Sequence, residues 1–196
     1  MPSYDRSAGE TAPVKILIAG GFGVGKTTLV ETVSEIEPLR TEERLTAAGI
    51  GVDDLDGIES KAVTTVAMDF GRLTLTDAGV VLYLFGTPGQ ERFWFMWEDL
   101  LNGALGAVVL VDTRRLDRSF PAVDFFESRG LPFVVAANCF HGEQHYTAEE
   151  IGAALHLRDP DTPILMLDAR TRGDVRDALL ALLDLLIAKA GVAATV

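Results

Sequence analysis

The chain has 196 residues, of which 48% are hydrophobic, which is enough for one well-packed domain and too few for two. Its 17 lysine and arginine residues stand against 29 acidic residues, and the net charge of −12 argues against a general binder of nucleic acid or of anionic membranes. No apolar run approaches the roughly 20 residues needed to cross a bilayer, and the first residues hold no apolar signal region. We therefore expect a cytoplasmic protein.

The two ends of the chain and its single cysteine bear on processing. Residues 1–12 are polar and predict a disordered leader, and residues 191–196 predict a short tail. Because Cys139 is the single cysteine, no intrachain disulfide can form, and the C-terminal residues hold no cysteine for prenylation. We expect any recruitment to a membrane to act through a partner.

The first half of the chain predicts a strand, a loop and a helix, followed by a β-hairpin. The apolar run VKILIAG ends in glycines, and KTTLVETVSEI has helical spacing. Residues 37–63 lose periodicity and contain proline, glycines and an acidic run, which predicts a long, mobile surface connection. The apolar runs TTVAMDFGRLTLT and GVVLYLF are separated by Asp77-Ala78-Gly79, a natural hairpin turn.

The second half alternates strands and helices. The runs GAVVLVD, PFVVAAN and PILMLD predict three buried strands, and helical patterns cover residues 93–101, 116–128, a short stretch from Thr147 and residues 174–190. TAEE has the spacing of a capping box at Thr147. One face of the last helix is apolar and is formed by Val175, Ala178, Leu179, Leu182 and Leu186.

These elements predict one α/β domain over residues 13–190. Continuous apolar strands that alternate with helices are typical of a mostly parallel sheet covered on both faces. We expect six strands, with one antiparallel pair from the hairpin.

The segment GGFGVGKT, residues 20–27, fits the phosphate-loop pattern G-x-x-x-x-G-K-[ST] between a predicted strand and a predicted helix. Backbone N–H groups and the helix N-terminus supply positive potential, Lys26 reaches the β and γ phosphates, and the Thr27 hydroxyl can ligate Mg²⁺. The predicted phosphate-binding residues are Gly20, Gly23, Val24, Gly25, Lys26, Thr27 and Thr28. The loop alone does not separate ATPases, kinases and GTPases.

With this loop, TTVAMDF and GTPGQ make the chain resemble the Ras-like small GTPases, which have the P-loop NTPase fold of a G domain. The resemblance implies a first switch over residues 37–65, in which Thr65, or alternatively Thr64, binds Mg²⁺. It implies a second switch over residues 86–97, in which the Gly89 N–H meets the γ-phosphate and Gln90 orients the attacking water. Two strand threonines and a plain turn are the simpler readings of these segments.

The combination SEIEPLRTEE, TTVAMDFG, GTPGQERFWFMW and LDAR is similar to the MglA-related, conservon-type GTPases of actinobacteria. In that group the resemblance implies a bacterial signalling switch that works with a roadblock-fold protein and a sensor-kinase-like protein. Composition and spacing carry no information about these partners.

Two departures from the small-GTPase pattern concern the phosphate end of the site. Gly86 stands where these proteins have an aspartate that holds a water on Mg²⁺, which should weaken metal affinity, and Asp69 on the neighbouring predicted strand is a candidate replacement. Phe22 would crowd the path of an activator's arginine finger, so we expect stimulated hydrolysis to use an internal arginine or a repositioned Gln90. The candidate arginines are Arg40, Arg44 and Arg92.

A third departure concerns the base. The G-domain pattern N-K-x-D corresponds to NCFH, in which Asn138 fits, Cys139 lacks the lysine stem and His141 lacks the carboxylate that accepts from guanine. Losing such charge-assisted bonds costs roughly tenfold to a hundredfold in affinity each, so guanine preference should be weaker unless Glu143 substitutes. LDAR resembles the remaining base loop, with the Ala169 N–H on the guanine oxygen and Arg170 beside it. An ordinary loop after a strand is the alternative reading of NCFH.

The aromatic segment FWFMW follows the second switch. On a helix Phe93 and Trp97 share a face while Trp94 points elsewhere, which suits a core helix, a partner surface, or both with Trp94 outside. We expect a small GTPase with Mg²⁺ as cofactor, GTP or GDP as bound nucleotide, weak intrinsic hydrolysis, and Gln90 and Lys26 as catalytic residues. The alternatives are a nucleotide-binding scaffold with little hydrolysis and, less favoured, an ATP-dependent phosphotransferase.

Overall fold

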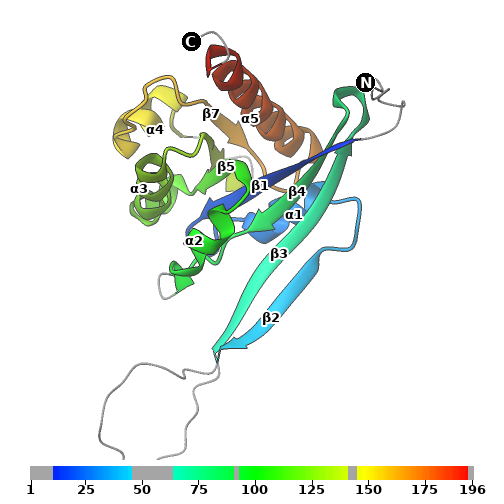
Figure 1. Cartoon of the computed structure of the whole chain (residues 1–196). Coiled ribbons are helices and arrows are strands. Elements are labelled where there is room, and N and C mark those ends of the chain that lie inside the picture. The colour runs from blue at the N-terminus through cyan, green and yellow to red at the C-terminus, as the bar shows by residue number, and fades with distance from the viewer. Residues whose placement is uncertain (1–10, 46–63, 91–92, 141–144, 194–196) are drawn as a thin grey trace, which may run out of the picture.

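The computed structural model describes residues 11–45, 64–90, 93–140 and 145–193. Within them, one sheet has the strand order β2-β3-β4-β1-β5-β6-β7 (Figure 1). Pairing is parallel from β4 through β1, β5 and β6 to β7, and antiparallel for β2 with β3 and for β3 with β4. The strands are β1 (Ala12–Gly20), β2 (Leu39–Leu45), β3 (Thr64–Leu75), β4 (Val80–Gly86), β5 (Ala104–Val111), β6 (Phe133–Asn138) and β7 (Ile164–Leu167).

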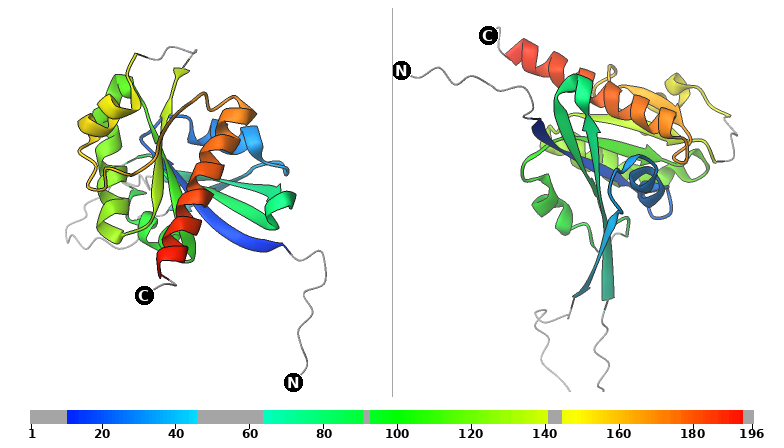
Figure 2. Two further views of the ribbon diagram at one scale, coloured as in Figure 1. Left: turned by 90° about the horizontal axis from the view of Figure 1, so that it is seen from above. Right: turned by 90° about the vertical axis from the view of Figure 1, so that its right-hand side faces the viewer.

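Helices cover both faces of the sheet, as the alternation of apolar segments predicted (Figures 1 and 2). α1 (Lys26–Val33) and α5 (Arg172–Ala193) bury their apolar faces against one side of the sheet, where Leu29, Val30 and Leu179 join the core. On the other side, α2 (Met96–Leu101), α3 (Phe120–Arg129) and α4 (Ala148–Leu155) contribute Trp97, Phe126 and Ile151. Two 3₁₀ segments, Thr76–Ala78 and Thr113–Ser119, connect β3 to β4 and β5 to α3.

The local signals in the sequence are confirmed at several places. Val175, Ala178, Leu179 and Leu182 are buried on α5, and Leu186 packs against the same core. Thr147 caps α4, because its side chain accepts from the Glu150 N–H while the Glu150 carboxylate accepts from the Thr147 N–H. No helix among the described residues is long and apolar enough to cross a membrane.

The sheet has one strand more than the sequence predicted. The six predicted strands are present, and β2 is a seventh that pairs with β3 inside the stretch expected to be an irregular connection. β2 and the adjoining half of β3 extend away from the body of the domain as a two-stranded arm (Figure 1). Residues 46–63, the rest of that connection, lie outside the described residues, as does most of the expected leader, whose last residue Ala12 already belongs to β1.

Candidate functional site

The phosphate loop leaves the carboxyl end of β1 and leads into α1, which is where ligands bind in open α/β sheets. Gly23 and Gly25 have φ values of 76° and 108°, and Gly25 forms the N-cap of α1. A Cβ atom at Gly20 would lie 2.3 Å from the Leu110 carbonyl oxygen. The glycines therefore allow the loop to curl tightly over the sheet and to point its backbone N–H groups at a ligand.

Lys26 lies under this loop with 9% of its surface exposed. Its Nζ donates to the carbonyl oxygens of Gly20 at 2.9 Å and of Gly21 at 2.8 Å. Burial lowers the pKa of the Lys26 ammonium to about 8, and the nearby Asp69 carboxylate opposes part of that shift. The ammonium is therefore held in place before any phosphate arrives.

Thr27 and Asp69 form the part of the site that suits a metal ion. The Thr27 hydroxyl donates to Asp69 Oδ2 at 2.6 Å, and Asp69 is 9% exposed. Among the described residues no group of three or more His, Cys, Asp or Glu side chains could hold a metal by itself. One hydroxyl and one carboxylate still fit Mg²⁺, because this ion is usually held by few protein oxygens together with substrate phosphates and waters.

A carboxylate of the neighbouring strand lies beside Gly86, where the small-GTPase pattern has an aspartate. Asp69 on β3 is the register partner of Gly86 on β4. A Cβ atom at Gly86 would lie 3.1 Å from both Cβ and Oδ2 of Asp69. The Asp69 carboxylate thus occupies the space beside Gly86, and the glycine leaves room for it.

The loop after β4 closes the other side of the pocket. A Cβ atom at Gly89 would lie 2.6 Å from Lys26 Nζ and 2.9 Å from the Phe22 backbone nitrogen, so only glycine fits against the phosphate loop. Gln90 lines the same pocket, whose volume is about 340 Å³. Its lining residues are Phe22, Gly23, Gly25, Lys26, Thr27, Thr28, Asp69, Thr87, Pro88, Gly89, Gln90 and Phe93.

The predicted first-switch threonines lie farther out on the arm. Thr64 and Thr65 are the first residues of β3, and Thr65 pairs with Arg44 of β2. Four residues of extended strand separate Thr65 from Asp69, which is roughly 13 Å. The role of Thr65 as a metal ligand stays a prediction.

Asn138 joins the phosphate loop to the predicted base loop. The buried Asn138 side chain donates through Nδ2 to the Val24 carbonyl at 2.9 Å and accepts through Oδ1 from the Ala169 N–H at 3.2 Å. We predicted that this N–H would face the guanine oxygen. The structure instead directs it into the protein, because the Asn138 amide lies between the two loops.

The rest of the base end differs from the G-domain pattern. Arg170 is turned back onto Asp168, whose carboxylate accepts from the Arg170 backbone N–H and side chain, with the shortest contact at 2.6 Å. The Arg114 guanidinium lies 4.0 Å from the centre of the Phe140 ring. His141 and Glu143 lie outside the described residues.

The structure adds an arginine that the sequence reasoning missed. Arg118, in the 3₁₀ segment after β5, packs against the phosphate loop, since a Cβ atom at Gly21 would lie 3.2 Å from its Cβ. With Phe22 and Gln90 it lines a second pocket of about 310 Å³. Of the arginines proposed from the sequence, Arg40 and Arg44 lie on β2, where their backbone register partners on β3 are Asp69 and Thr65, and Arg92 lies outside the described residues.

The aromatic segment divides between core and surface, but not as predicted. Phe93 and Trp97 are buried, as expected, and Trp97 Nε1 donates to the Pro88 carbonyl at 3.1 Å. Trp94 is half-buried against Trp97, at 5.8 Å between ring centres, and it is Phe95 that is 63% exposed. The difference arises because α2 begins at Met96, so the preceding residues form turns and do not follow helical spacing.

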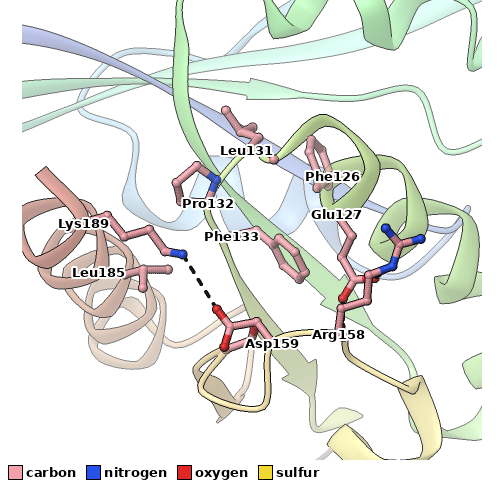
Figure 3. Close-up of a pocket in the computed structure, with 11 residues that line it drawn as sticks. Phe126, Glu127, Leu131, Pro132, Phe133, Arg158, Asp159, Leu185 and Lys189 are labelled. Carbon is pink, nitrogen blue, oxygen red and sulfur yellow. Dashed lines mark hydrogen bonds and ion pairs between the residues drawn. The ribbon is translucent and has the colours of Figure 1, made fainter. Parts of the chain in front are cut away.

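Another pocket, of about 160 Å³, lies at the amino end of β6, at the opposite end of the strands from the phosphate loop (Figure 3). Its charged side chains are already paired, Lys189 with Asp159 at 3.7 Å and Arg158 with the buried Glu127 carboxylate at 3.3 Å. The pocket at the carboxyl end of β1 is the better candidate for nucleotide chemistry, because it unites a buried lysine, a hydroxyl, a carboxylate and a glycine-rich helix N-terminus.

Comparison with known proteins assigns most of the chain to a described family. Residues 18–189 match the family described as conserved hypothetical ATP binding protein. The chain belongs to this family. An uncharacterized protein of Methanocaldococcus jannaschii is 32% identical over 127 residues, which cover 64% of this chain and 69% of the relative.

Further relatives lie among the Ras-like GTPases. The Ras-related protein Rab-7b of Homo sapiens is 29% identical over 150 residues, 76% of this chain and 63% of the relative. The G domain of the T. maritima FeoB iron transporter matches in fold with a TM-score of 0.60 at 16% identity, over 88% of this chain and 98% of that domain. The whole cytosolic domain of FeoB in a GDP form matches with a TM-score of 0.64 at 15% identity, over 91% of this chain and 65% of that chain. The chain therefore has the fold of the P-loop GTPase superfamily, and it spans less than two thirds of Rab-7b.

Proposed function

We propose that the protein is a nucleotide-dependent molecular switch that binds GTP and GDP with Mg²⁺ and hydrolyses GTP slowly. The observation that carries this proposal is the meeting of Lys26, the Thr27–Asp69 pair, Gly89 and Gln90 in one pocket. A phosphotransferase would need an acceptor site, whereas a glutamine beside the phosphate loop suits water as the acceptor.

In this proposal each residue has a defined task. Lys26 contacts the β and γ phosphates, the Gly89 N–H donates to the γ-phosphate, and Gln90 orients the attacking water in line with the bond that breaks. Thr27 and Asp69 would hold Mg²⁺, which supplies neutralisation of phosphate charge. Loss of the γ-phosphate removes contacts to the loop at Gly89. The GTP-bound and GDP-bound forms then differ in their contacts to this loop, which is what two-state switching requires.

Guanine selectivity is expected to be modest. The Asn138 side chain and the Ala169 N–H bond to the protein, and Cys139 has no lysine stem for the base. The family description names ATP, whereas the Rab and FeoB relatives are GTPase-like. ATP and GTP are therefore both candidate substrates, and they differ only in the base that the site must recognise.

The resemblance of both switch segments to conservon-type GTPases extends the proposal to bacterial signalling with a roadblock-fold partner and a sensor-kinase-like partner. In this setting the protein would be cytoplasmic and would reach the membrane through those partners. The alternative is a nucleotide-binding scaffold with little hydrolysis and weak guanine selectivity, and it is favoured by the exposed Phe22 beside Gln90.

Calorimetric titration of nucleotide-free protein with GTP, GDP and ATP, with and without Mg²⁺, tests binding, and phosphate release over many turnovers tests hydrolysis. We expect Mg²⁺-dependent binding and slow phosphate release that falls at least tenfold in Gln90→Leu. Tight binding with no phosphate release above a Lys26→Ala blank would favour the scaffold. Hydrolysis of ATP in preference to GTP would mean that the protein is an ATPase and that the pocket recognises adenine.

A further inference from the structure

The Thr87 side chain is a polar group of the candidate site to which the proposed function assigns no task. Thr87 is 2% exposed, and its Oγ1 has no hydrogen-bond partner among the described residues. It lines the nucleotide pocket with Lys26, Asp69 and Gln90. The backbone N–H of Thr87 donates to the Ile18 carbonyl at 2.8 Å, which fixes the residue to β1.

A buried hydroxyl without a partner is unusual, because folding breaks its hydrogen bonds to water and no hydrogen bond within the protein replaces them, which costs stability. Thr32 and Thr74 avoid this loss. Thr32 Oγ1 lies 2.7 Å from the carbonyl oxygens of Thr28 and Ala169, and Thr74 Oγ1 donates to Glu35 at 2.8 Å. Among the described residues, Trp94 Nε1 is also buried without a partner, and Trp94 lines the second pocket beside Arg118.

We propose that the Thr87 hydroxyl is a γ-phosphate ligand that finds its hydrogen-bond partner only when a nucleoside triphosphate fills the pocket. This proposal rests on the proposed function and deepens it. Thr87 precedes Gly89 and Gln90, the loop residues assigned to the γ-phosphate and the attacking water, and it lines the same pocket as Lys26 and Thr27 at the N-terminus of α1. Its hydroxyl would donate to a γ-phosphate oxygen, and it would distinguish triphosphate from diphosphate.

Thr87→Val tests the proposal, because it keeps the shape of the side chain and removes the hydroxyl, whereas Thr87→Ser keeps the hydroxyl and removes the methyl group. Calorimetry with non-hydrolysable GTP and ATP analogues and with GDP measures the effect independently of the base and of catalysis. We expect Thr87→Val to weaken binding of the preferred triphosphate analogue about tenfold to a hundredfold, with GDP affinity changed less than about twofold. Thr87→Ser should bind like the wild type.

Thermal unfolding of the nucleotide-free protein gives a second, independent readout. Thr87→Val should leave Tm unchanged or raise it, since the variant removes a buried polar group that has no partner. Thr74→Val is the matched control, because its hydroxyl is bonded and lies far along β3 from the pocket, so Tm should fall while nucleotide binding stays as in the wild type.

The outcomes separate this proposal from the proposed function. If the wild type binds neither triphosphate, the proposed function fails and the assignment of Thr87 fails with it. If the wild type binds but Thr87→Val binds the triphosphate equally well, or weakens GDP to the same degree, the assignment alone is wrong. A clear fall in the Tm of nucleotide-free Thr87→Val would also overturn it, since the hydroxyl would then have a partner inside the folded protein.

Discussion

The Lys26 ammonium is buried under the phosphate loop, and burial lowers its pKa from 10.5 to about 8 in the nucleotide-free protein. A bound triphosphate places negative charge against this group and favours its protonated form. Above pH 8, binding must therefore take up a proton. We predict that triphosphate affinity falls as pH rises through 8, approaching about tenfold per pH unit.

Calorimetry at pH 8.5 in buffers of different ionisation enthalpy measures this uptake, which should exceed about half a proton for GTP. Lys26→Met is the control and should bind weakly with no uptake in this range. The same pKa predicts that the free energy of unfolding of the nucleotide-free protein increases as the pH rises from 8 to 10.5. In this range the unfolded state binds more protons than the folded state. Affinity that is constant from pH 7 to 9.5 would contradict the assignment of this pKa.

The Asp69 side chain on β3 fills the space beside Gly86 on β4, where a larger residue would collide with it. We predict that Asp69→Ala reduces Mg²⁺ affinity about tenfold to a hundredfold in the presence of GTP, because the carboxylate that orients Thr27 is lost. Gly86→Asp alone should also reduce Mg²⁺ affinity, since the new carboxylate would be forced against the Asp69 carboxylate.

The double variant Asp69→Ala with Gly86→Asp moves the carboxylate from β3 to β4. We expect it to recover at least part of the Mg²⁺ dependence, as measured by GTP titrations at a series of Mg²⁺ concentrations. A double variant no better than Asp69→Ala, in a protein whose circular dichroism matches the wild type, would show that the position of the carboxylate on β3 is required. Wild-type Mg²⁺ dependence in Asp69→Ala itself would remove the metal role of Asp69.

At the scale of elements, Asn138 at the end of β6 connects the phosphate loop to the loop after β7. Asn138→Ala leaves the Val24 carbonyl and the Ala169 N–H without these partners, which should cost about 2 to 4 kcal/mol of unfolding free energy. Urea denaturation measures this cost. Asn102→Ala, at an exposed position after α2, should change stability by less than about 0.5 kcal/mol.

The same variant separates support of the loops from reading of the base. If Asn138 acts by joining the loops, Asn138→Ala weakens GTP and ATP binding by the same factor and leaves their ratio unchanged. A selective loss of GTP affinity would mean that the Asn138 side chain reads guanine and that the bonds to Val24 and Ala169 rearrange when nucleotide binds.

Elements that carry their own local signal could be predicted from the sequence. The phosphate loop, the Asp77-Ala78-Gly79 turn and the Thr147 capping box are each encoded within a few residues. β2 could not be predicted, because LRTEERL is mostly charged and is held as an edge strand by backbone pairing to β3 alone. Such a strand depends on its partner, and nothing in its own periodicity indicates it.

The candidate site follows the same division. Lys26 and Thr27 come from one contiguous motif, and the proximity of Asp69 followed from two neighbouring strands. The engagement of the Ala169 N–H by Asn138 was missed, because it depends on how three strand ends meet in space. Thr87 and Arg118 were also missed, since a buried hydroxyl and an arginine after a strand have no signature until packing places them.

At the scale of the whole molecule, the nucleotide pocket adjoins a surface with exposed aromatic side chains. Phe22 and Phe95 are each more than 60% exposed. Phe22 belongs to the phosphate loop and lines the pocket, and Phe95 follows Phe93, the last lining residue of the loop after β4. Exposed aromatic residues beside a nucleotide-sensing loop suit a partner that distinguishes the two nucleotide states. The proposed roadblock-fold partner would then bind the face that includes α2 and the phosphate loop.

Phe95→Ser tests this arrangement, because Phe95 is not among the residues that line the pocket and its loss should spare intrinsic hydrolysis. Truncation of a central aromatic contact costs about 2 kcal/mol of binding, so we predict a roughly 30-fold loss in partner affinity and a matching loss of stimulated phosphate release. Ile187→Ser on α5 is the control, since Ile187 is 70% exposed and lies on the other side of the sheet. Equal partner affinity for both variants would place the interface elsewhere on the domain, whereas a loss confined to the triphosphate state would connect the aromatic surface to the switch.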